Sequence, residues 1–288
     1  MISILLIRIK PGLWTKTEFL MLKFLWKLIT FCKNPKQMKA DKSLLLFLIF
    51  QLAMISSVLA QDAIEIVRRA DEKMRGKTSQ AEMTIKTSRP TWTREMSVKT
   101  WMKGNDYAMI LIQAPAKDKG TVFLKRKKEV WNWLPTVERS IKLPPSMMSQ
   151  SWMGTDFTND DLVKESSIVE DYTHSIVGDT IIDSRNSYII QMIPKPEAAL
   201  VWGKLIVCID KKDFLELHSR FYDEDGFLVN TMDAYDIKEM DGRLIPTRLV
   251  MIPADKKNQK TEIIYTKIQF NIPIDDNFFT LDKMRNLN

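Results

Sequence analysis

Residues 95–112 read EMSVKTWMKGNDYAMILI, and this stretch decides the fold class. In its first half, apolar or small side chains alternate with mostly polar ones, which is the period of a half-buried strand. Gly104, Asn105 and Asp106 then supply a turn signal. Residues 107–112 follow as an uninterrupted apolar strand. The stretch therefore predicts two antiparallel strands joined by a turn.

Strand and turn signals of the same kind continue to the end of the chain. Before them, Asp62 to Arg75 has the spacing of one amphipathic helix, with Ile64, Val67 and Met74 near one face. Gly76 is the expected stop of this helix. Further strands are expected at 121–124, 129–134, 139–143, 167–177, 187–194, 202–210, 214–222, 227–238, 243–252 and 261–271.

This pattern predicts a mainly β (α+β) chain with about eleven antiparallel strands and few helices. Nothing alternates strand with helix as a parallel sheet requires, so a large sheet, sandwich or barrel is expected. No linker interrupts residues 61–288, and we expect them to form a single domain.

The apolar strand that follows the first turn has two apolar faces. Ala108, Ile110 and Ile112 point to one side, whereas Tyr107 and Met109 point to the other. A strand of this kind needs cover on both sides. We expect the helix to cover one face, and an opposed sheet wall or a bound apolar ligand to cover the other.

The formal net charge of +7 belongs to the first part of the chain. Lys and Arg outnumber Asp and Glu by seven within residues 1–60, and residues 61–288 taken together carry equal numbers of acidic and basic side chains. Within that remainder, residues 61–150 are net basic and residues 151–288 net acidic. The basic isoelectric point therefore does not indicate a nucleic-acid partner.

The N-terminal region has the pattern of an export signal. Lys39 and Lys42 precede an apolar run at 43–59, and Ala60 precedes Gln61 at a small-residue exit. This predicts a secretory signal peptide over 38–60, cleaved between Ala60 and Gln61, and hence a periplasmic protein. The alternative is an uncleaved segment that anchors the chain to the inner membrane, for which the run is at the lower limit of length.

Residues 1–37 are interpreted as an over-extended translation start, because a signal peptide would begin at Met38. The alternative is a real amphipathic membrane segment from Phe19 to Cys32. After cleavage Cys208 is the remaining cysteine, so no disulfide is expected within the mature chain, and the thiol is interpreted as a core residue.

Residues 131–162 read WNWLPTVERSIKLPPSMMSQSWMGTDFTNDDL and carry the strongest indication of function. Flat aromatic rings and soft methionine side chains can repack around ligands of variable shape, such as acyl chains. With the two from the apolar strand, the candidate cavity residues are Tyr107, Met109, Trp131, Trp133, Met147, Met148, Trp152, Met153 and Phe157. The other interpretation is a crossover loop whose apolar groups cap the core, and composition alone favours it.

Several short motifs resemble the outer membrane lipoprotein-sorting protein family, which is similar to the LolA/LolB lipoprotein carriers. They are the Trp-Leu-Pro strand, the basic Arg139/Lys142 strand, the run 153–162, the turn 221–226 and the run 241–247. The resemblance covers nearly all of residues 61–288. The motif residues are Pro135, Gly154, Asp156, Asp161, Asp241, Gly242 and Pro246.

The resemblance implies an incomplete antiparallel barrel curved around helices. It places the N-terminal helix and short lid helices in or over the concave face, and an apolar cavity for lipid or acyl chains beneath them. No motif in this sequence matches the lid and arginine contacts of the well-studied carriers. The fold is therefore implied more strongly than the cargo.

The sequence contains no recognisable catalytic or metal-binding motif. His174 and His218 are the histidines of the chain, and neither lies near a cysteine in sequence, so no metal site is expected. No Gly-x-Ser-x-Gly turn and no glycine-rich phosphate loop occurs. Asp160-Asp161 is interpreted as a helix cap, and Lys125–Lys128 as a solvated hairpin tip.

The sequence thus favours an exported carrier or binding protein that shields lipid or the acyl chains of lipoproteins, with no catalytic residue and no cofactor. The expected partners are the lipid cargo, an inner-membrane transporter, an outer-membrane acceptor and transient membrane contact, but not nucleic acid. The alternative is a sensory or scaffold domain of the same fold that binds an envelope protein such as a transporter or stress regulator. A third reading, an envelope hydrolase, would need Asp156 or Asp161 for turnover.

Overall fold

The structure is a computed structural model that describes residues 62–163, 167–198 and 200–287. These residues belong to one compact unit, Leu59–Asn288. The expected signal peptide at 38–60 and the preceding segment 1–37 lie outside the described residues. No helix within the described part is long and apolar enough to cross a membrane.

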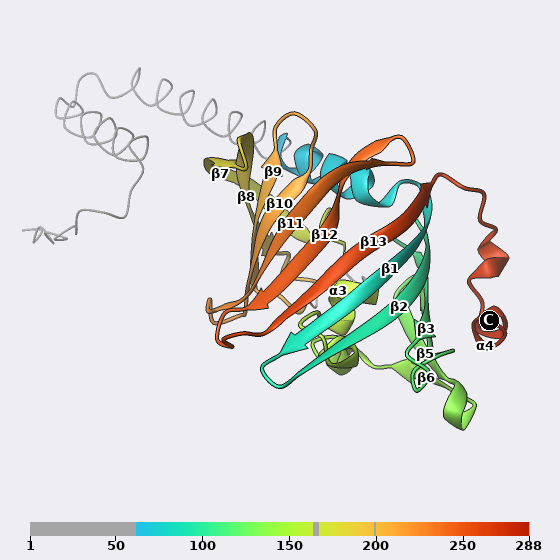
Figure 1. Cartoon of the computed structure of the whole chain (residues 1–288). Coiled ribbons are helices and arrows are strands. Elements are labelled where there is room, and N and C mark those ends of the chain that lie inside the picture. The colour runs from blue at the N-terminus through green and yellow to red at the C-terminus, as the bar shows by residue number, and fades with distance from the viewer. Residues whose placement is uncertain (1–61, 164–166, 199, 288) are drawn as a thin grey trace, which may run out of the picture. The chain divides into compact units, whose positions relative to one another are not determined.

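The described residues form one sheet of 13 antiparallel strands that is not closed into a barrel (Figure 1). In chain order the strands are β1 (Thr78–Arg89), β2 (Trp92–Lys103), β3 (Tyr107–Ala114), β4 (Val122–Arg126), β5 (Glu129–Leu134), β6 (Arg139–Leu143), β7 (Tyr172–Ile182), β8 (Arg185–Pro194), β9 (Lys204–Asp210), β10 (Glu216–Tyr222), β11 (Leu228–Met240), β12 (Arg243–Pro253) and β13 (Lys260–Phe270).

Helical elements are short apart from the N-terminal helix, residues 62–75. The others are η1 (Pro135–Val137), η2 (Pro145–Met147), η3 (Trp152–Gly154), α3 (Asn159–Val163), η4 (Asp276–Phe278) and α4 (Leu281–Arg285). The incomplete barrel and the short helices confirm the expected mainly β class, with two strands more than the expected eleven or so.

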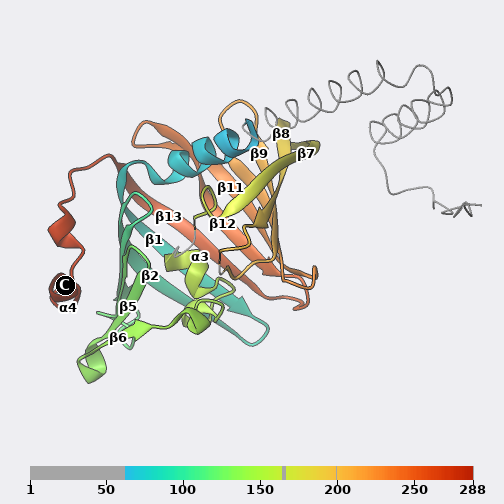
Figure 2. The same ribbon diagram turned by 180° about the vertical axis from the view of Figure 1, so that it is seen from behind.

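The strand order explains how the concave side of the sheet is covered. The order is β6-β5-β4-β3-β2-β1-β13-β12-β11-β10-β9-β8-β7, so consecutive strands form hairpins on each side of the β1–β13 pair. Strands β6 and β7 are adjacent in sequence but form the two opposite edges of the sheet. The connection between them (residues 144–171, called the crossover) must therefore bridge the open side, and α3 lies over the concave face (Figure 2).

The larger core lies between this concave face, the crossover and the N-terminal helix. Side chains from all three belong to one buried cluster, including Val67 from the helix, Ile85 and Ile112 from the sheet, and Trp152 from the crossover. The buried helix face is centred on Ala63, Ile66, Val67 and Ala70, while the expected Ile64 and Met74 pack at its margin. Gly76 ends the helix with a φ of 66°.

The second apolar face of β3 is covered by the end of the chain, which corrects the expectation of an opposed sheet wall or a ligand. The C-terminal segment (residues 273–287) runs along the outside of the sheet (Figure 1). Its Phe279, Met284 and Leu287 form a second buried cluster with Met109, Leu111, Val122 and Leu124. The ring of Tyr107 stacks on Phe279 with 5.3 Å between centroids.

Two sequence predictions differ from the structure, one on the start of a strand and one on the exposure of a lysine. The strand expected at 167–177 begins only at Tyr172, because the Ser167 N–H donates to the Asp171 carboxylate at 2.7 Å and the Asp171 N–H to the Ser167 carbonyl at 2.9 Å, closing a local turn. The expected solvated tip at 125–128 is wrong for Lys125, which lies within β4 and is buried.

Candidate functional site

A cavity of about 250 Å³ lies between the concave face of the sheet, the N-terminal helix and the crossover. Most of its wall is apolar and comes from the middle of the sheet. This part includes Ala81, Met83 and Ile85 of β1, Ile110 of β3, and Met251 and Ile263. The wall therefore offers an alkyl chain contact on several sides, with few hydrogen-bonding groups in the centre.

Charged side chains border the cavity at the N-terminal helix. Asp71 and Arg75, one helical turn apart, form an ion pair in which both side chains are nearly inaccessible. The Arg75 Nη1 also donates to the Gly104 carbonyl at 3.3 Å. Burial lowers the pKa of Arg75 to about 10, so the guanidinium stays charged at neutral pH. Its charge is matched by Asp71.

A second polar group forms where α3 faces the sheet. The Thr158 N–H donates to the Asp161 carboxylate at 2.8 Å, and the Asp161 N–H donates to the Thr158 hydroxyl at 3.1 Å. This reciprocal pair is a capping box in which Thr158 is the N-cap and Asp161 lies in the first turn of α3, so the Asp160-Asp161 pair is not itself the cap that the sequence predicted. The Trp202 indole N–H also donates to Asp161, at 2.9 Å. Burial nevertheless raises the pKa of the Asp161 carboxyl.

Two tyrosines and two more carboxylates also line the cavity. Asp160 and Glu216 line the cavity, and Glu216 accepts a hydrogen bond from the Ser219 hydroxyl. Burial, together with the charges of Asp160 and Asp161, raises the pKa of Tyr172 above its usual range. Burial raises the pKa of Tyr265 to about 12.

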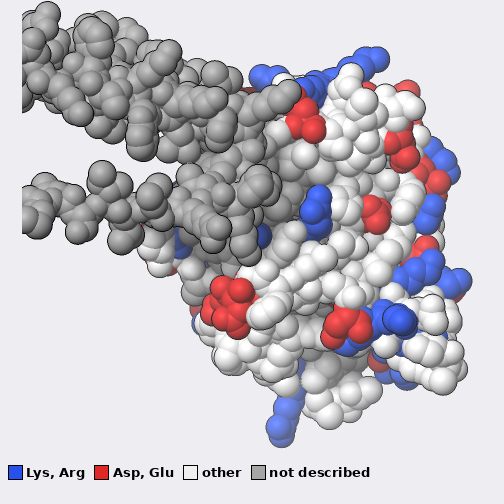
Figure 3. Space-filling model, turned by 90° about the vertical axis from the view of Figure 1, so that its left-hand side faces the viewer, with Lys and Arg blue, Asp and Glu red and all other residues white. Residues whose placement is uncertain are grey.

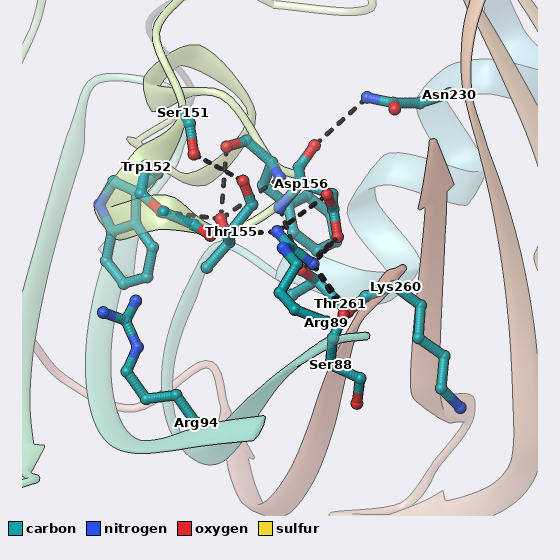
Figure 4. Close-up of polar contacts among 12 residues, drawn as sticks. Ser88, Arg89, Arg94, Ser151, Trp152, Thr155, Asp156, Asn230, Lys260 and Thr261 are labelled. Carbon is teal, nitrogen blue, oxygen red and sulfur yellow. Dashed lines mark hydrogen bonds and ion pairs between the residues drawn. The ribbon is translucent and has the colours of Figure 1, made fainter. Parts of the chain in front are cut away.

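An ion pair attaches the crossover to the end of β1 (Figure 4). Arg89 donates from Nη1 and Nη2 to the two carboxylate oxygens of Asp156 at 2.9 and 3.0 Å. The Thr261 hydroxyl donates to the same carboxylate at 2.7 Å, and the Asn230 amide donates to the Asp156 carbonyl at 3.2 Å. The Asp156 side chain is only 6% exposed. Strands β1, β11 and β13 therefore share one buried contact with the crossover.

The backbone beside Asp156 is held by arginines of the β1–β2 hairpin. Arg89 Nη2 donates to the Gly154 carbonyl at 3.1 Å, and Arg94 donates to the Met153 carbonyl. Met153 and Gly154 both have left-handed backbone angles, with φ of 49° and 76°. A left-handed pair turns the chain sharply, and the arginines occupy the carbonyls that this turn leaves without secondary-structure partners.

The predicted cavity residues separate into three places. Phe157 lines the cavity. Met148 and Trp152 are buried in the larger core, with the Trp152 ring 5.4 Å from that of Phe123, and Met147 and Met153 pack at its margin. Four residues lie on the outer face beneath the C-terminal segment, namely Tyr107, Met109, Trp131 and Trp133. The alternation of strand side chains sends these four away from the cavity.

The predicted family-motif residues serve the wall, the crossover and the turns. Asp161 and Pro246 line the cavity, whereas Asp156 and Gly154 hold the crossover. Asp241 and Gly242, with φ of 48° and 73°, form the β11–β12 turn, and the Asp241 carboxylate accepts from the Phe270 N–H at 2.6 Å. Pro135 begins η1 after β5.

Sequence reasoning missed most of the cavity wall. The residues of β1 were not identified, since no strand was expected there, and Arg75 was treated only as a helix end. Tyr172, Trp202 and Tyr265 carried no motif. One sequence feature could have pointed to the cavity: Asp71 and Arg75 are charged residues next to the apolar face of the helix, where apolar side chains are expected.

The cysteine and the two histidines of the described residues lie on strands of the sheet. They contain no group of three or more His, Cys, Asp or Glu side chains placed to hold a metal. Cys208 is buried on β9, and burial raises the pKa of its thiol. His218 contacts Asp233 at 2.7 Å on the sheet, and His174 is buried on β7 beside the crossover.

Solved structures with the same fold are found in several bacteria. A DUF1329 family protein from Desulfovibrio piger has a TM-score of 0.71 at 21% identity, covering 78% of this chain and 99% of that chain. An outer membrane lipoprotein-sorting protein domain from Vibrio parahaemolyticus has a TM-score of 0.69 at 21% identity, with the same two coverages. A LolA superfamily protein from Nitrosomonas europaea has a TM-score of 0.68 at 22% identity, again covering 78% and 99%.

Sequence comparison places the chain in a family. No curated protein matches the chain in sequence. A family model described as an uncharacterized protein matches residues 104–286, which is more than half of the chain. The chain therefore belongs to the family that this model describes, and it shares its fold with the LolA superfamily and lipoprotein-sorting structures.

Proposed function

We propose that the chain is an exported, non-enzymatic carrier that shields lipid or the acyl chains of lipoproteins on their way across the periplasm. The observation that carries the proposal is the apolar cavity of about 250 Å³ enclosed by the sheet, the N-terminal helix and the crossover. The cavity is lined mainly by Ile, Met and Ala side chains, which offer water few hydrogen-bond partners. Such a cavity favours an alkyl ligand over water.

The energetics suit reversible carriage. Each buried CH₂ gains roughly 0.8 kcal/mol, so a ten-carbon chain gains about 8 kcal/mol before the cost of association is subtracted. A binding free energy of this order allows the protein to take up a ligand from a membrane or a protein donor and to release it to an acceptor. Transient contacts with an inner-membrane transporter and an outer-membrane acceptor belong to this proposal, as does export by the signal peptide expected at 38–60.

The crossover supplies the movable wall in this proposal. Its contacts to the sheet around Asp156 are hydrogen bonds and one ion pair, which can break and form again without covalent change. The cavity is smaller than usual ligand sites, which measure roughly 300–1,000 Å³, and in this conformation it has room for one alkyl chain. Binding of a lipid anchor with several acyl chains would therefore require the crossover to move.

Native mass spectrometry of protein purified from the periplasm tests the proposal. We expect bound lipid, and after delipidation we expect uptake of the neutral fluorophore N-phenyl-1-naphthylamine with an emission increase. Protein that carries no lipid and takes up no fluorophore would contradict the proposal. A stoichiometric protein partner recovered without lipid would instead favour the sensory or scaffold alternative.

A further inference from the structure

Most of the exposed large apolar side chains in the described residues lie at one end of the sheet. They belong to turns and strand ends on the side away from the N-terminal helix (Figures 1 and 2). We call this set the apolar rim, and it consists of Trp92, Val137, Ile193, Phe227, Leu228 and Ile252. The turns 104–106, 126–129, 183–184 and 241–242, at the other end, consist of charged, polar or glycine residues. The two ends of the sheet therefore differ in polarity.

The apolar rim is a set of separate projections. Trp92 lies at the β1–β2 turn, Val137 in η1 between β5 and β6, and Phe227 at the β10–β11 turn. Trp92 is 47% and Phe227 70% exposed, and no residue of the rim lines the cavity. A protein interface is a continuous patch with a packed core. Aromatic and aliphatic groups on different turns that point the same way are better suited to entering a soft apolar layer together.

Charged side chains of both signs lie between these projections. The acidic run 223–225 precedes Phe227, and residues 255–257, Asp-Lys-Lys, follow Ile252. Because β11 pairs with β12, the two turns lie side by side. A membrane interface accommodates this pattern, since aromatic rings enter at the level of the headgroups while charged side chains stay in water or among the headgroups. The rim offers no patch of a single sign that would require an anionic lipid.

The apolar rim is connected to the crossover through Arg89. The guanidinium carbon of Arg89 lies 5.8 Å from the centre of the Trp92 ring, and the same guanidinium binds Asp156 of the crossover. Asn230, two residues after Leu228, donates to the Asp156 carbonyl. The crossover, which is the movable wall in the proposed function, is therefore attached to the sheet at the end that carries the rim.

We infer that the apolar rim is the surface with which the protein docks on a lipid bilayer, and that Trp92 and Phe227 insert among the headgroups. The inference rests on the proposed function, because a carrier of lipid has to meet a membrane, and it names the surface that does so. Docking in this orientation brings the attachment of the crossover to the membrane. Because the charges beside the rim are of both signs, docking depends on apolar insertion and little on lipid charge or salt.

Flotation of the full mature chain with phosphatidylcholine vesicles tests the inference. We expect the wild-type protein to float with the vesicles, and the addition of phosphatidylglycerol or of salt should change its affinity by less than about twofold. Failure of the wild-type protein to float would overturn the inference, as would binding that added salt abolishes. The wild-type measurement needs no variant, so it decides the matter even if a variant fails to fold.

Two variants and a matched control locate the contact. Trp92→Glu and Phe227→Glu place a charge where a ring should insert, and each should weaken vesicle binding by about tenfold or more. Ile181→Glu changes a side chain of β7 that is 69% exposed, as Phe227 is, but lies towards the other end of the sheet, and it should bind as the wild-type protein does. Full binding by folded Trp92→Glu and Phe227→Glu proteins, or an equal loss in all three variants, would overturn the inference.

Uptake of N-phenyl-1-naphthylamine separates this inference from the proposed function, because no residue of the rim lines the cavity. A protein that takes up the fluorophore but does not float retains the carrier proposal and overturns the docking surface. A protein that floats through the rim but takes up no fluorophore supports the docking surface and contradicts the carrier proposal. If neither binding is seen, both fail.

Discussion

At the scale of single residues, buried polar side chains hold the parts of the fold that surround the cavity. His174 shows this beside the crossover. Its ring contacts the Ile168 carbonyl at 2.7 Å, and because a carbonyl only accepts, Nε2 carries the proton and donates. Ile168 lines the cavity, so the histidine fixes a piece of the wall. Burial lowers the pKa of His174, and the charge of Lys195 lowers it further.

The lowered pKa of His174 predicts a loss of stability in mild acid. The unfolded chain takes up a proton as the pH falls through about 6.5, whereas the folded chain does so only at its lower folded pKa. The stabilisation is therefore present above about pH 6.5 and is lost as the pH falls towards the folded value. Thermal unfolding should show a drop in Tm from pH 7.5 to 5.5 that His174→Gln reduces.

His218→Gln is the matched control for this measurement, because it removes the other histidine of the chain from a more accessible position. The control should keep most of the acid-dependent drop in Tm. Should His174→Gln show the same pH profile as the wild-type protein, another group would be responsible for the acid sensitivity.

At the scale of elements, the crossover depends on one buried ion pair. Strand β1 presents Arg89 and strand β13 presents Thr261, and Asp156 of the crossover receives hydrogen bonds from both. Removing one partner of a buried pair leaves the other charge without compensation, which costs more than the pair itself contributes. The position of the crossover is therefore sensitive to Asp156 in particular.

Asp156→Ala should lower the free energy of unfolding by roughly 3–5 kcal/mol. It should also raise amide hydrogen exchange in residues 151–163 more than elsewhere. Urea unfolding and exchange followed by mass spectrometry measure the two effects. The control is Asp276→Ala, which breaks the exposed contact with Lys103 and should cost less than about 1 kcal/mol. Equal losses in the two variants would show that Asp156 does not hold the crossover.

The C-terminal segment is the other element with a defined structural role. Its Phe279, Met284 and Leu287 cover apolar side chains on the outside of β3 and β4. Ending the chain after Pro273 should expose that surface and remove roughly 4.5–9 kcal/mol of stabilisation from the burial of these three side chains, at about 1.5–3 kcal/mol for each. Urea unfolding should show a lower midpoint, and a hydrophobic dye should bind the outer face.

A substitution gives a milder version of the same test. Phe279→Ala should lower the free energy of unfolding by about 3–5 kcal/mol, as for other buried aromatic residues. Phe227→Ala, at an exposed turn where the ring is 70% accessible, should change it little. If the truncated chain unfolds at the same midpoint as the full chain, the segment does not stabilise the sheet.

Local sequence patterns predicted the strands better than they predicted the cover of each face. The alternation at Met96–Met102 and the apolar run after Tyr107 gave β2 and β3 directly, because side-chain direction follows from strand period. Strand β1 was missed since Ala81 and Thr87 weaken its alternation. Trp131 and Trp133 were placed in the cavity because period alone cannot tell the concave face from the convex one, and only the C-terminal segment decides this.

At the scale of the whole molecule, the cavity results from a sheet whose two edges do not meet. Strands β6 and β7 end the sheet, and the crossover and the N-terminal helix cover the space between. Charge contributes less to this arrangement: on the face drawn in Figure 3, acidic and basic side chains are interspersed among uncharged ones. The size of the cavity thus depends on packing between elements that are distant in sequence. Local sequence patterns do not contain this information.

Filling the cavity tests whether it is the site of ligand uptake. Ala81 is buried on β1 and lines the cavity, so Ala81→Leu adds three carbon atoms to the cavity wall. Cavity filling of this kind commonly raises stability by about 0.5–2 kcal/mol. We expect an unchanged or higher Tm together with at least a fivefold loss of N-phenyl-1-naphthylamine uptake. Ala254→Leu, in the exposed β12–β13 turn, should change neither. Full uptake by a folded Ala81→Leu protein would place the ligand somewhere other than this cavity.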